Sequence, residues 1–325
     1  MEVKFLNYKS SDTDPIFLNS AYLMTRSNDF GWIGGYVNGQ LQAVISYTLK
    51  AKFFFKAATF HSSTHILYGE LSISQEKVFL NKCLELLRKI GVDFCSQSPT
   101  HVVFNSFPEG SKFANFGTYF VCLGLPEEEL WSRVHLKHRN VILNAKKKGV
   151  RIKFGDIDNI LPIYSMLENT MGRSKMKFIP LNAFMKIING ISENIEIVSA
   201  YYVEQLQGCA IFLFNRYGAY YLYGGSSGQQ LLGSMNLLHW EAMKTFKSRG
   251  IKLYDFVGAR LRPMPGSRLE GIQRFKSRFG AQIKSGYLWK KPTTKIGYIY
   301  FILKPIISWK NKDIIDQELC EKYNE

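Results

Sequence analysis

The sequence has few of the features that mark secreted, membrane-spanning or metal-binding proteins. Its 325 residues contain no run of 18 apolar residues, which a membrane-spanning helix requires. The first residues, MEVKFLN, lack the basic segment and apolar run of a secretory signal. The five cysteines are scattered and never spaced as CxxC, which argues against a disulfide framework and a zinc site. These absences predict a cytoplasmic protein with no bound metal.

Acidic residues are scarce as well. The chain has 26 Asp and Glu against 42 Lys and Arg, a formal net charge of +16. Residues 247–295 alone contain 13 basic and two acidic side chains. A cluster this dense predicts a polyanionic partner, such as cofactor phosphates, a nucleic acid or an anionic membrane surface. The alternative is a solvated basic face that only aids solubility.

The chain is long enough for two domains, and the same order of elements is predicted twice. In the first half the pattern predicts a hairpin over 34–47 that turns at Asn38-Gly39, a strand towards 66–72, a helix over 75–90 and a strand from Val92. In the second half it predicts strands over 195–203 and 209–214 around a loop at 204–208, a strand over 219–223, a helix over 235–249 and a strand over 251–257.

Three short sequence echoes support this repeat. They are QLQ at 40–42 and 205–207, LYG at 67–69 and 222–224, and GVDF at 91–94 with the segment 250–256. Because they occur in the same order with similar offsets, they count as evidence together although each alone would be chance.

Further helices are predicted between and after the two repeats. One long helix is expected over 127–148, with Pro126 at its first turn, glutamates at its start and lysines at its end. Shorter helices are expected near 158–170 and 181–190. The apolar and aromatic tail, 296–309, is expected to pack on the first half, and lying at a membrane interface is the alternative.

A three-strand meander followed by a Gly- and Ser-rich turn, a helix and a strand resembles the acetyltransferase-like (GNAT) fold. We therefore expect an α/β protein made of two tandem acetyltransferase-like domains packed together, over 1–124 and 125–290, with a tail over 291–325 that packs back on the first domain. In that fold the turn before the helix binds pyrophosphate, because backbone N–H groups at a helix start are unpaired.

The segment Gln230 to Ser234 resembles the Q/R-x-x-G-x-G/A signature of coenzyme A-binding acetyltransferases, although Met235 stands where Gly or Ala is usual. Gln230, Gly233 and Ser234 are thus the predicted cofactor-binding residues. An ordinary capped helix start is the competing interpretation.

Three stretches carry a more specific resemblance. They are EELW at 128–131 with RNVILNAKKKG at 139–149, then YDFVG at 254–258, and then FKSRFG at 275–280. As an ordered set they are similar to the Fem-type (FemAB-like) aminoacyltransferases, which build peptidoglycan interpeptide bridges. The resemblance covers most of residues 60–290.

The resemblance implies an acyltransferase of the aminoacyltransferase type that forms an amide on an amine of a cell-envelope precursor. Fem-type enzymes take the aminoacyl group from aminoacyl-tRNA and place it on a nucleotide- or lipid-linked precursor. The expected partners are therefore aminoacyl-tRNA as co-substrate and such a glycan precursor, with no tightly bound cofactor and no DNA. The expected location is the cytoplasm, with peripheral contact at the inner face of the plasma membrane left open.

The resemblance also implies the catalytic residues. The F-K pair of the last motif lies by the acyl donor in the family, which points to Phe275 and Lys276. A lysine can neutralise an oxyanion or a donor phosphate, and an aromatic ring can stack on a base. The alternative is that Phe275 is a core residue and Lys276 a surface charge. Asp255 is a candidate that contacts the substrate amine, although a structural role at the strand end is favoured.

Substrate-binding residues follow from shorter matches. Thr170 and Arg173 resemble the family's T-x-x-R segment, in which the arginine binds precursor phosphates. Tyr223 matches an aromatic residue near the acceptor. Arg139 and Arg260 are candidates for phosphate contacts from a helix and a basic loop. Each of the five has an ordinary structural role as its alternative.

Two other functions remain open at the level of sequence. An acyl-coenzyme A-dependent N-acyltransferase acting on an amino sugar would use the segment 230–234. A non-enzymatic protein that binds nucleic acid or a membrane surface would explain the basic cluster without any acyl transfer.

Overall fold

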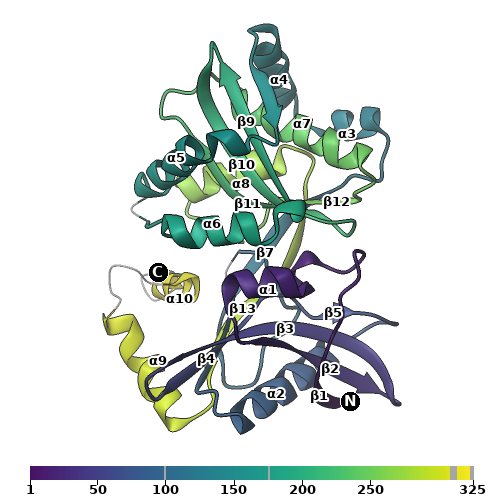
Figure 1. Cartoon of the computed structure of the whole chain (residues 1–325), viewed down its shortest axis with the longest axis vertical. Helices are drawn as coiled ribbons and strands as arrows, with labels where there is room; N and C mark the ends of the chain where they lie inside the picture. The colour runs from purple at the N-terminus through teal and green to yellow at the C-terminus, as the bar shows by residue number, and fades with distance from the viewer. Residues whose placement is uncertain (99, 175, 308–312, 323–325) are drawn as a thin grey trace.

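The computed structural model describes residues 1–98, 100–174, 176–307 and 313–322. One mixed sheet runs through the whole molecule in the order β1-β2-β3-β4-β6-β13-β7-β12-β11-β10-β9-β8, and β5 pairs with β3 (Figure 1). The strands are β1 (Glu2–Leu6), β2 (Phe30–Val37), β3 (Gln40–Lys52), β4 (Phe55–Phe60), β5 (His65–Ile66), β6 (Phe94–Gln97), β7 (Lys112–Cys122), β8 (Arg151–Phe154), β9 (Ile195–Tyr202), β10 (Gln205–Phe214), β11 (Ala219–Ser226), β12 (Leu253–Asp255) and β13 (Gln282–Pro292).

Helices cover the sheet in both halves. They are α1 (Ser20–Arg26), α2 (Ile73–Lys89), α3 (Glu127–Arg133), α4 (Leu136–Lys147), α5 (Ile160–Gly172), α6 (Leu181–Gly190), α7 (Ser234–Ser248), α8 (Arg268–Ser277), α9 (Lys295–Ile307) and α10 (Ile314–Lys322). Among the described residues, no helix is long and apolar enough to cross a membrane.

The two halves have the same topology, which confirms the predicted fold class of tandem acetyltransferase-like domains. The first half is an antiparallel meander β2-β3-β4, then α2, then β6 parallel to β4. The second is an antiparallel meander β9-β10-β11, then α7, then β12 parallel to β11. Each half has its own buried apolar cluster, around Phe79 and Phe60 in the first and around Phe212 and Phe246 in the second.

Two strands that were not predicted join the halves. The late strand β13 pairs with β6 of the first half and, over most of its length, with β7. β7 in turn pairs with β12 of the second half. The sheet is therefore continuous, and a strand near the end of the chain lies at its centre.

Two strand predictions in the repeat are wrong. The third strand of the first meander is β4, not a strand towards 66–72, and only His65 and Ile66 of that region form a short strand. The echo at 67–69 thus has no structural counterpart at 222–224, which lies inside β11. The second-half hairpin turns tightly at Val203 and Glu204, both with positive φ, instead of through a loop at 204–208.

The other predicted turns and helices are confirmed, except that one predicted helix is interrupted. The turn at Asn38-Gly39, with φ of 51° and 79°, and the helices α2, α5, α6 and α7 lie where expected. The long helix over 127–148 is two helices, α3 and α4. The break occurs at His135, whose Nδ1 accepts from the Lys137 N–H and whose own N–H donates to the carbonyl of Arg278.

The helix α9 of the tail lies against the first half. On α9 the ring of Tyr300 contacts Phe55 and Phe94, with ring centroids 4.4 and 5.3 Å apart. Residues 308–309 of the predicted tail segment lie outside the described residues.

Candidate functional site

The strands β11 and β12 separate after two residue pairs. Their parallel pairing is limited to Ala219 with Tyr254 and Tyr220 with Asp255. Beyond that point the chain after β12 bonds to β7 instead, with Phe256 N–H donating to the Tyr119 carbonyl at 2.8 Å. A break in the β10–β11 register at Leu222 bends β11 at the same level. We call this wedge between residues 221–226 and 256–259 the strand splay.

Lys276 extends from α8 to the base of the strand splay. Its side chain is only 8% exposed, and its ammonium group donates to the carbonyls of Val257 and, at 2.7 Å, Gly258. Burial lowers the pKa of Lys276 to about 8, although the nearby Asp255 favours the charged form. Lys276 is therefore not a surface charge, and its protonation can change close to neutral pH.

Asp255 holds the turn that receives Lys276. Its Oδ1 accepts from the hydroxyl of Thr118 and from the Val257 N–H, at 2.7 Å in the second case. Burial raises the pKa of Asp255, while these hydrogen bonds and Lys276 oppose the rise. In this arrangement Asp255 positions the carbonyl of Val257 for Lys276.

Phe275, the partner of Lys276 in the motif, lies in an aromatic cluster. Its ring centroid is 5.2 Å from that of Phe279, 5.4 Å from His138 and 5.5 Å from His239. It is partly buried against the core of the second half. The described contacts thus correspond to packing, and stacking on a base stays a prediction.

Thr170 and Arg173 meet at the end of β11. The Arg173 guanidinium donates to the Ser226 carbonyl at 2.6 Å and to the Thr170 hydroxyl at 2.9 Å, and this hydroxyl also accepts from the Ser226 N–H. The predicted T-x-x-R pair therefore lies at the open end of the strand splay. Arg173 is largely exposed and keeps donors that can reach a phosphate.

Tyr223 lies on β11 beyond the register break. Its ring packs edge-on against Phe178, with centroids 5.1 Å apart. Burial lowers the pKa of Arg26, but its interactions with Tyr22 and Tyr223 outweigh this and raise it overall, so Tyr223 lies close to this arginine. Tyr223 thus connects the strand splay to a residue of the first half.

The segment 230–234 precedes α7 as predicted, but its glycine, Gly233, lies against the backbone of α4. Gly233 has φ of +93°, and a Cβ there would lie 2.2 Å from the Val141 carbonyl oxygen of α4. The Ser234 hydroxyl donates to the Leu231 carbonyl, and Gln230 is exposed. The close approach of α4 explains why a glycine stands here without any ligand.

Arg139 and Arg260 lie in different places. Arg139 is on α4, two residues before Val141, and its Nε is a buried donor with no partner among the described residues. Arg260 is bound to the C-terminal helix, since its guanidinium pairs with Glu318 at 2.7 Å and with the Gln317 amide oxygen at 2.5 Å. Of the two, only Arg139 has an unused buried donor.

A pocket between the halves is lined by two cationic side chains, Arg26 and Lys50, that the sequence did not single out. It has a volume of about 360 Å³, and we call it the cationic pocket. It is lined by Thr25, Arg26, Thr48, Lys50, Thr59, His61, Ser96, Gln97, Ser98, Ile179, Ala183 and Ile187. No carboxylate is among these residues, so the pocket suits an anion. Because Arg26 lies close to Tyr223, the pocket adjoins the strand splay.

Several polar atoms of this pocket have no partner among the described residues. They are Nδ1 of His61 and both polar atoms of the Gln97 side chain. Buried polar groups are normally hydrogen-bonded, and an unpaired one costs about 1–3 kcal/mol. These atoms are therefore available to a bound ligand.

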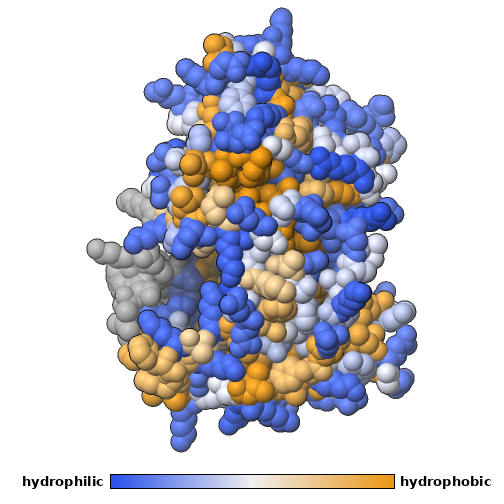
Figure 2. Space-filling model, in the orientation of Figure 1, coloured by the Kyte–Doolittle hydropathy of each residue, from blue (hydrophilic) through white to orange (hydrophobic). Residues whose placement is uncertain are grey.

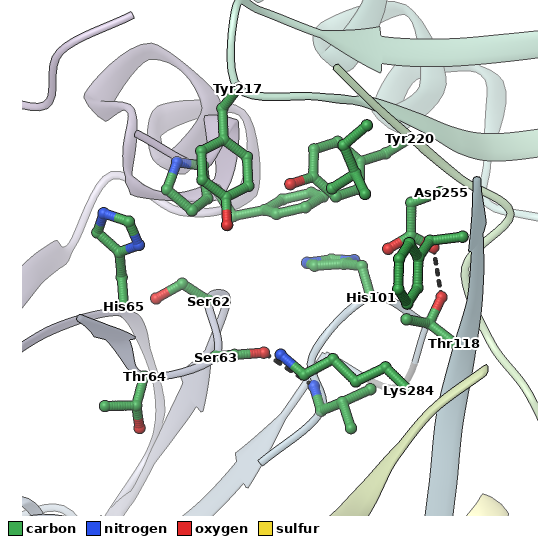
Figure 3. A pocket seen from close by; sticks show the side chains of 15 residues that line it. Ser62, Ser63, Thr64, His65, His101, Thr118, Tyr217, Tyr220, Asp255 and Lys284 are labelled. Atoms are coloured by element: carbon green, nitrogen blue, oxygen red, sulfur yellow. Dashed lines mark hydrogen bonds between the residues drawn. The ribbon is translucent and has the colours of Figure 1, made fainter. Parts of the chain in front are cut away.

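A second pocket lies across a wall of buried rings. This polar pocket, about 240 Å³ in volume, is lined by Asp255, Thr118, Lys284, Tyr217, Tyr220 and residues 62–65, among others (Figure 3). His101 lines it, stacks on Phe17 at 3.7 Å between ring centroids, and its Nε2 bonds to the His61 carbonyl at 2.9 Å. Burial lowers the pKa of His101 to about 3, so this wall is uncharged at neutral pH.

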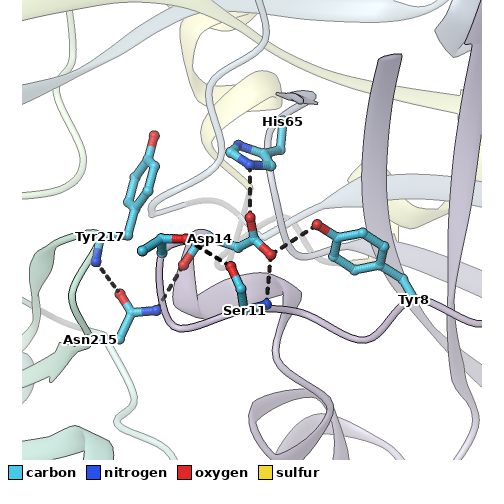
Figure 4. Close-up of polar contacts among 7 residues, drawn as sticks. Tyr8, Ser11, Asp14, His65, Asn215 and Tyr217 are labelled. Carbon is cyan, nitrogen blue, oxygen red and sulfur yellow. Dashed lines mark hydrogen bonds and ion pairs between the residues drawn. The ribbon is translucent and has the colours of Figure 1, made fainter. Parts of the chain in front are cut away.

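A hydrogen-bond network beside the polar pocket joins the halves (Figure 4). Asp14 accepts from the Tyr8 hydroxyl at 2.9 Å and the Ser11 N–H at 2.8 Å, and it pairs with His65 at 3.3 Å. The Asn215 amide donates to the Asp14 carbonyl at 2.7 Å. These contacts fix the first half against the second. Within the described residues, no group of three potential metal ligands occurs.

Comparisons with known proteins agree with this geometry. Residues 191–287 match the model of the FemAB family, which confirms the expected resemblance over the segment that contains β9 to α8. No curated protein matches the chain.

Among solved structures, a crystal structure of FemX is similar over 93% of this chain and 100% of that chain, with a TM-score of 0.69 at 13% identity. The structure of L-PGS from Bacillus licheniformis is similar over 93% and 98% of the two chains, with a TM-score of 0.51 at 12% identity. At these identities the likeness establishes the fold. Together with the family match it supports a transferase.

Proposed function

We propose that this protein is an aminoacyltransferase that moves an aminoacyl group from aminoacyl-tRNA to an amine of a peptidoglycan or related envelope precursor. The observation that carries the proposal is the match to the FemAB family over residues 191–287, because that segment contains the strand splay and the buried Lys276. The similarity to FemX over the full length of that chain agrees with it.

The strand splay is the proposed place of reaction. Residues 221–225 of β11 no longer pair with β12, which leaves this edge open to an extended donor end, whereas the backbone of Ser226 is already bonded to Thr170 and Arg173. Lys276 carries a positive charge at the base of the wedge, where it stabilises the oxyanion that forms when an amine attacks the ester carbonyl. The C–N bond forms, the ester C–O bond breaks, and the proton lost by the amine ends on the released ribose hydroxyl.

The cationic pocket is the proposed acceptor site. Arg26 and Lys50 provide two positive charges without a competing carboxylate in the lining, which suits the phosphates of a nucleotide- or lipid-linked precursor. The proximity of Arg26 to Tyr223 connects this pocket with the splay. An acceptor held by its phosphates can thus extend its amine towards Lys276.

Acyl-coenzyme A is the alternative donor, and Gln230, Gly233 and Ser234 would be its binding residues. One observation disfavours it: the Val141 carbonyl lies where a side chain on Gly233 would be, so α4 covers the glycine that would approach a pyrophosphate. Exposed basic residues of 247–295 that form no ion pair among the described residues, such as Lys252, Arg262 and Lys284, suit the longer phosphate backbone of a tRNA.

The donor is tested by label transfer. Purified protein is incubated with nucleotide- and lipid-linked precursors and with either labelled aminoacyl-tRNA or labelled acetyl-coenzyme A. We expect label in the precursor only from aminoacyl-tRNA. Transfer only from acetyl-coenzyme A would overturn the proposal in favour of the alternative donor, and salt-sensitive tRNA binding without transfer from either would favour a binding protein.

The role of Lys276 is tested with a matched lysine. Lys247 also donates to two carbonyls, those of Leu123 and Leu125, but from the last turn of α7. Lys276→Met should lower kcat by about a hundredfold or more, as the loss of one oxyanion donor does. Lys247→Met should leave kcat within about twofold. Equal losses in the two variants would mean that Lys276 only clamps the backbone.

A further inference from the structure

The first half carries an exposed apolar surface made by two segments that are far apart in the sequence. At the tip of the β3–β4 hairpin, Phe53 and Phe54 are 91% and 83% exposed. On α9 the exposed side chains follow helical spacing and are Ile296, Tyr298, Ile299, Ile302 and Leu303. We call these seven side chains the apolar rim.

The hairpin and α9 lie side by side. Phe55, which follows the exposed pair, contacts Tyr300 on the inner face of α9 at 4.4 Å between ring centroids. Figure 1 shows the β3–β4 tip reaching α9 at the lower left, and Figure 2 shows hydrophobic atoms gathered over α9 at the same corner, with hydrophilic atoms around them. The inner face of α9 therefore packs on the protein, and its outer face continues the exposed hairpin tip.

Two large aromatic side chains at a hairpin tip are not needed for the fold. The turn has Phe53 at a positive φ of 54°, a conformation that Gly or Asn adopts at less cost. Exposed apolar surface of this kind marks an interaction site. The strained, exposed Phe53 thus indicates contact with another molecule.

The exposed charge around the apolar rim is mostly positive. Residues 30–69 and 271–312 contain no Asp or Glu. Lys52 and Lys295 flank the rim, and neither has a carboxylate within ion-pair distance among the described residues. Lys304 is the exception, since it lies 3.8 Å from Asp313. Apolar side chains bordered by unpaired lysines complement an anionic bilayer, in which the rings enter the interface and the ammonium groups meet lipid phosphates.

We propose that the apolar rim is a membrane-docking surface that binds anionic lipid bilayers, with Phe53, Phe54 and the outer face of α9 inserted at the interface. Lys50 of the cationic pocket lies on β3 three residues before Phe53, or roughly 10 Å along the chain. Docking would therefore bring the mouth of that pocket close to the lipid headgroups. This last consequence rests on the proposed function, whereas docking itself does not.

The test is flotation of the full chain, without substrates, with vesicles of phosphatidylcholine alone or mixed with phosphatidylglycerol. We expect binding to the mixed vesicles, weakening with salt, and little binding to phosphatidylcholine. Binding to both kinds alike, or to neither, would overturn the proposal. Because no substrate is present, failure here leaves the transfer assay unaffected.

Variants separate the rim from the general basic charge. Phe53→Ser with Phe54→Ser should weaken binding at least about tenfold, and Lys52→Gln and Lys295→Gln about fivefold each. Val203→Ser, at another exposed hairpin turn (72% exposed), is the matched control and should bind as the wild type does. Unchanged binding of the double phenylalanine variant would refute the assignment. Concentration-dependent self-association that this variant abolishes, without vesicle binding, would identify a second copy of the chain as the partner instead.

Discussion

The buried charge of Lys276 makes a prediction that needs no substrate. Burial holds its pKa near 8, against an ordinary value of 10.5. Between these two pH values the unfolded chain binds a proton that the folded chain does not, so the free energy of unfolding rises with pH. The shift corresponds to about 3 kcal/mol in total, gained at about 1.4 kcal/mol per pH unit above pH 8.

The assay compares urea unfolding of the wild type and Lys276→Met at a series of pH values from 7 to above 9. The methionine variant also loses the donor to the Val257 and Gly258 carbonyls, but this cost does not depend on pH. The free energy of unfolding of the wild type minus that of Lys276→Met should be constant below about pH 8 and should rise above it. Lys247→Met should show no such slope relative to the wild type. A flat difference for Lys276 would refute the claim that its charge is buried.

Three further predictions concern the pocket, the predicted donor loop and the contact between the halves. Arg26→Ala and Lys50→Ala should each raise the KM for a phosphate-bearing acceptor about tenfold or more with little change in Tm, and an unchanged KM would exclude the cationic pocket as the acceptor site. Gly233→Ala should lower stability by about 2 kcal/mol or more in thermal unfolding, because of its positive φ and the adjacent α4 carbonyl, whereas Gly228→Ala, which meets open space, should be neutral. Burial alone would raise the pKa of Asp14, but its hydrogen bonds lower it overall. Asp14→Asn should therefore lower the free energy of unfolding at neutral pH, and this loss should vanish as the pH falls below about 4. A loss that does not depend on pH would contradict this.

The repeated topology could be predicted because its signals are local. Asn38-Gly39 specifies a tight turn, and the helices have clear apolar periodicity and end signals. The LYG echo gave a wrong third strand for the first meander, because three residues carry too little information. The segment 67–69 lies outside the meander. The position of β13 between β6 and β7 could not be predicted, since it depends on pairing between segments more than 150 residues apart.

Part of the candidate site could be proposed from the sequence because its residues stand in local motifs. Lys276, Asp255, Thr170 and Arg173 stand in recognisable motifs, and the structure brings them to the two ends of one strand splay. Arg26 and the other lining residues of the cationic pocket have no motif of their own. Their common location follows from the packing of the two halves, which no local pattern reports.

The central claim is that the protein joins an amino acid to an amine of an envelope precursor. The most direct measurement is mass spectrometry of a nucleotide-linked muramyl peptide after incubation with the protein and a mixture of charged tRNAs. The account predicts a mass increase equal to one or more aminoacyl residues, located on an amine of the peptide and strongly reduced with Lys276→Met. An unmodified precursor with charged tRNA, but an acetylated one with acetyl-coenzyme A, would contradict it.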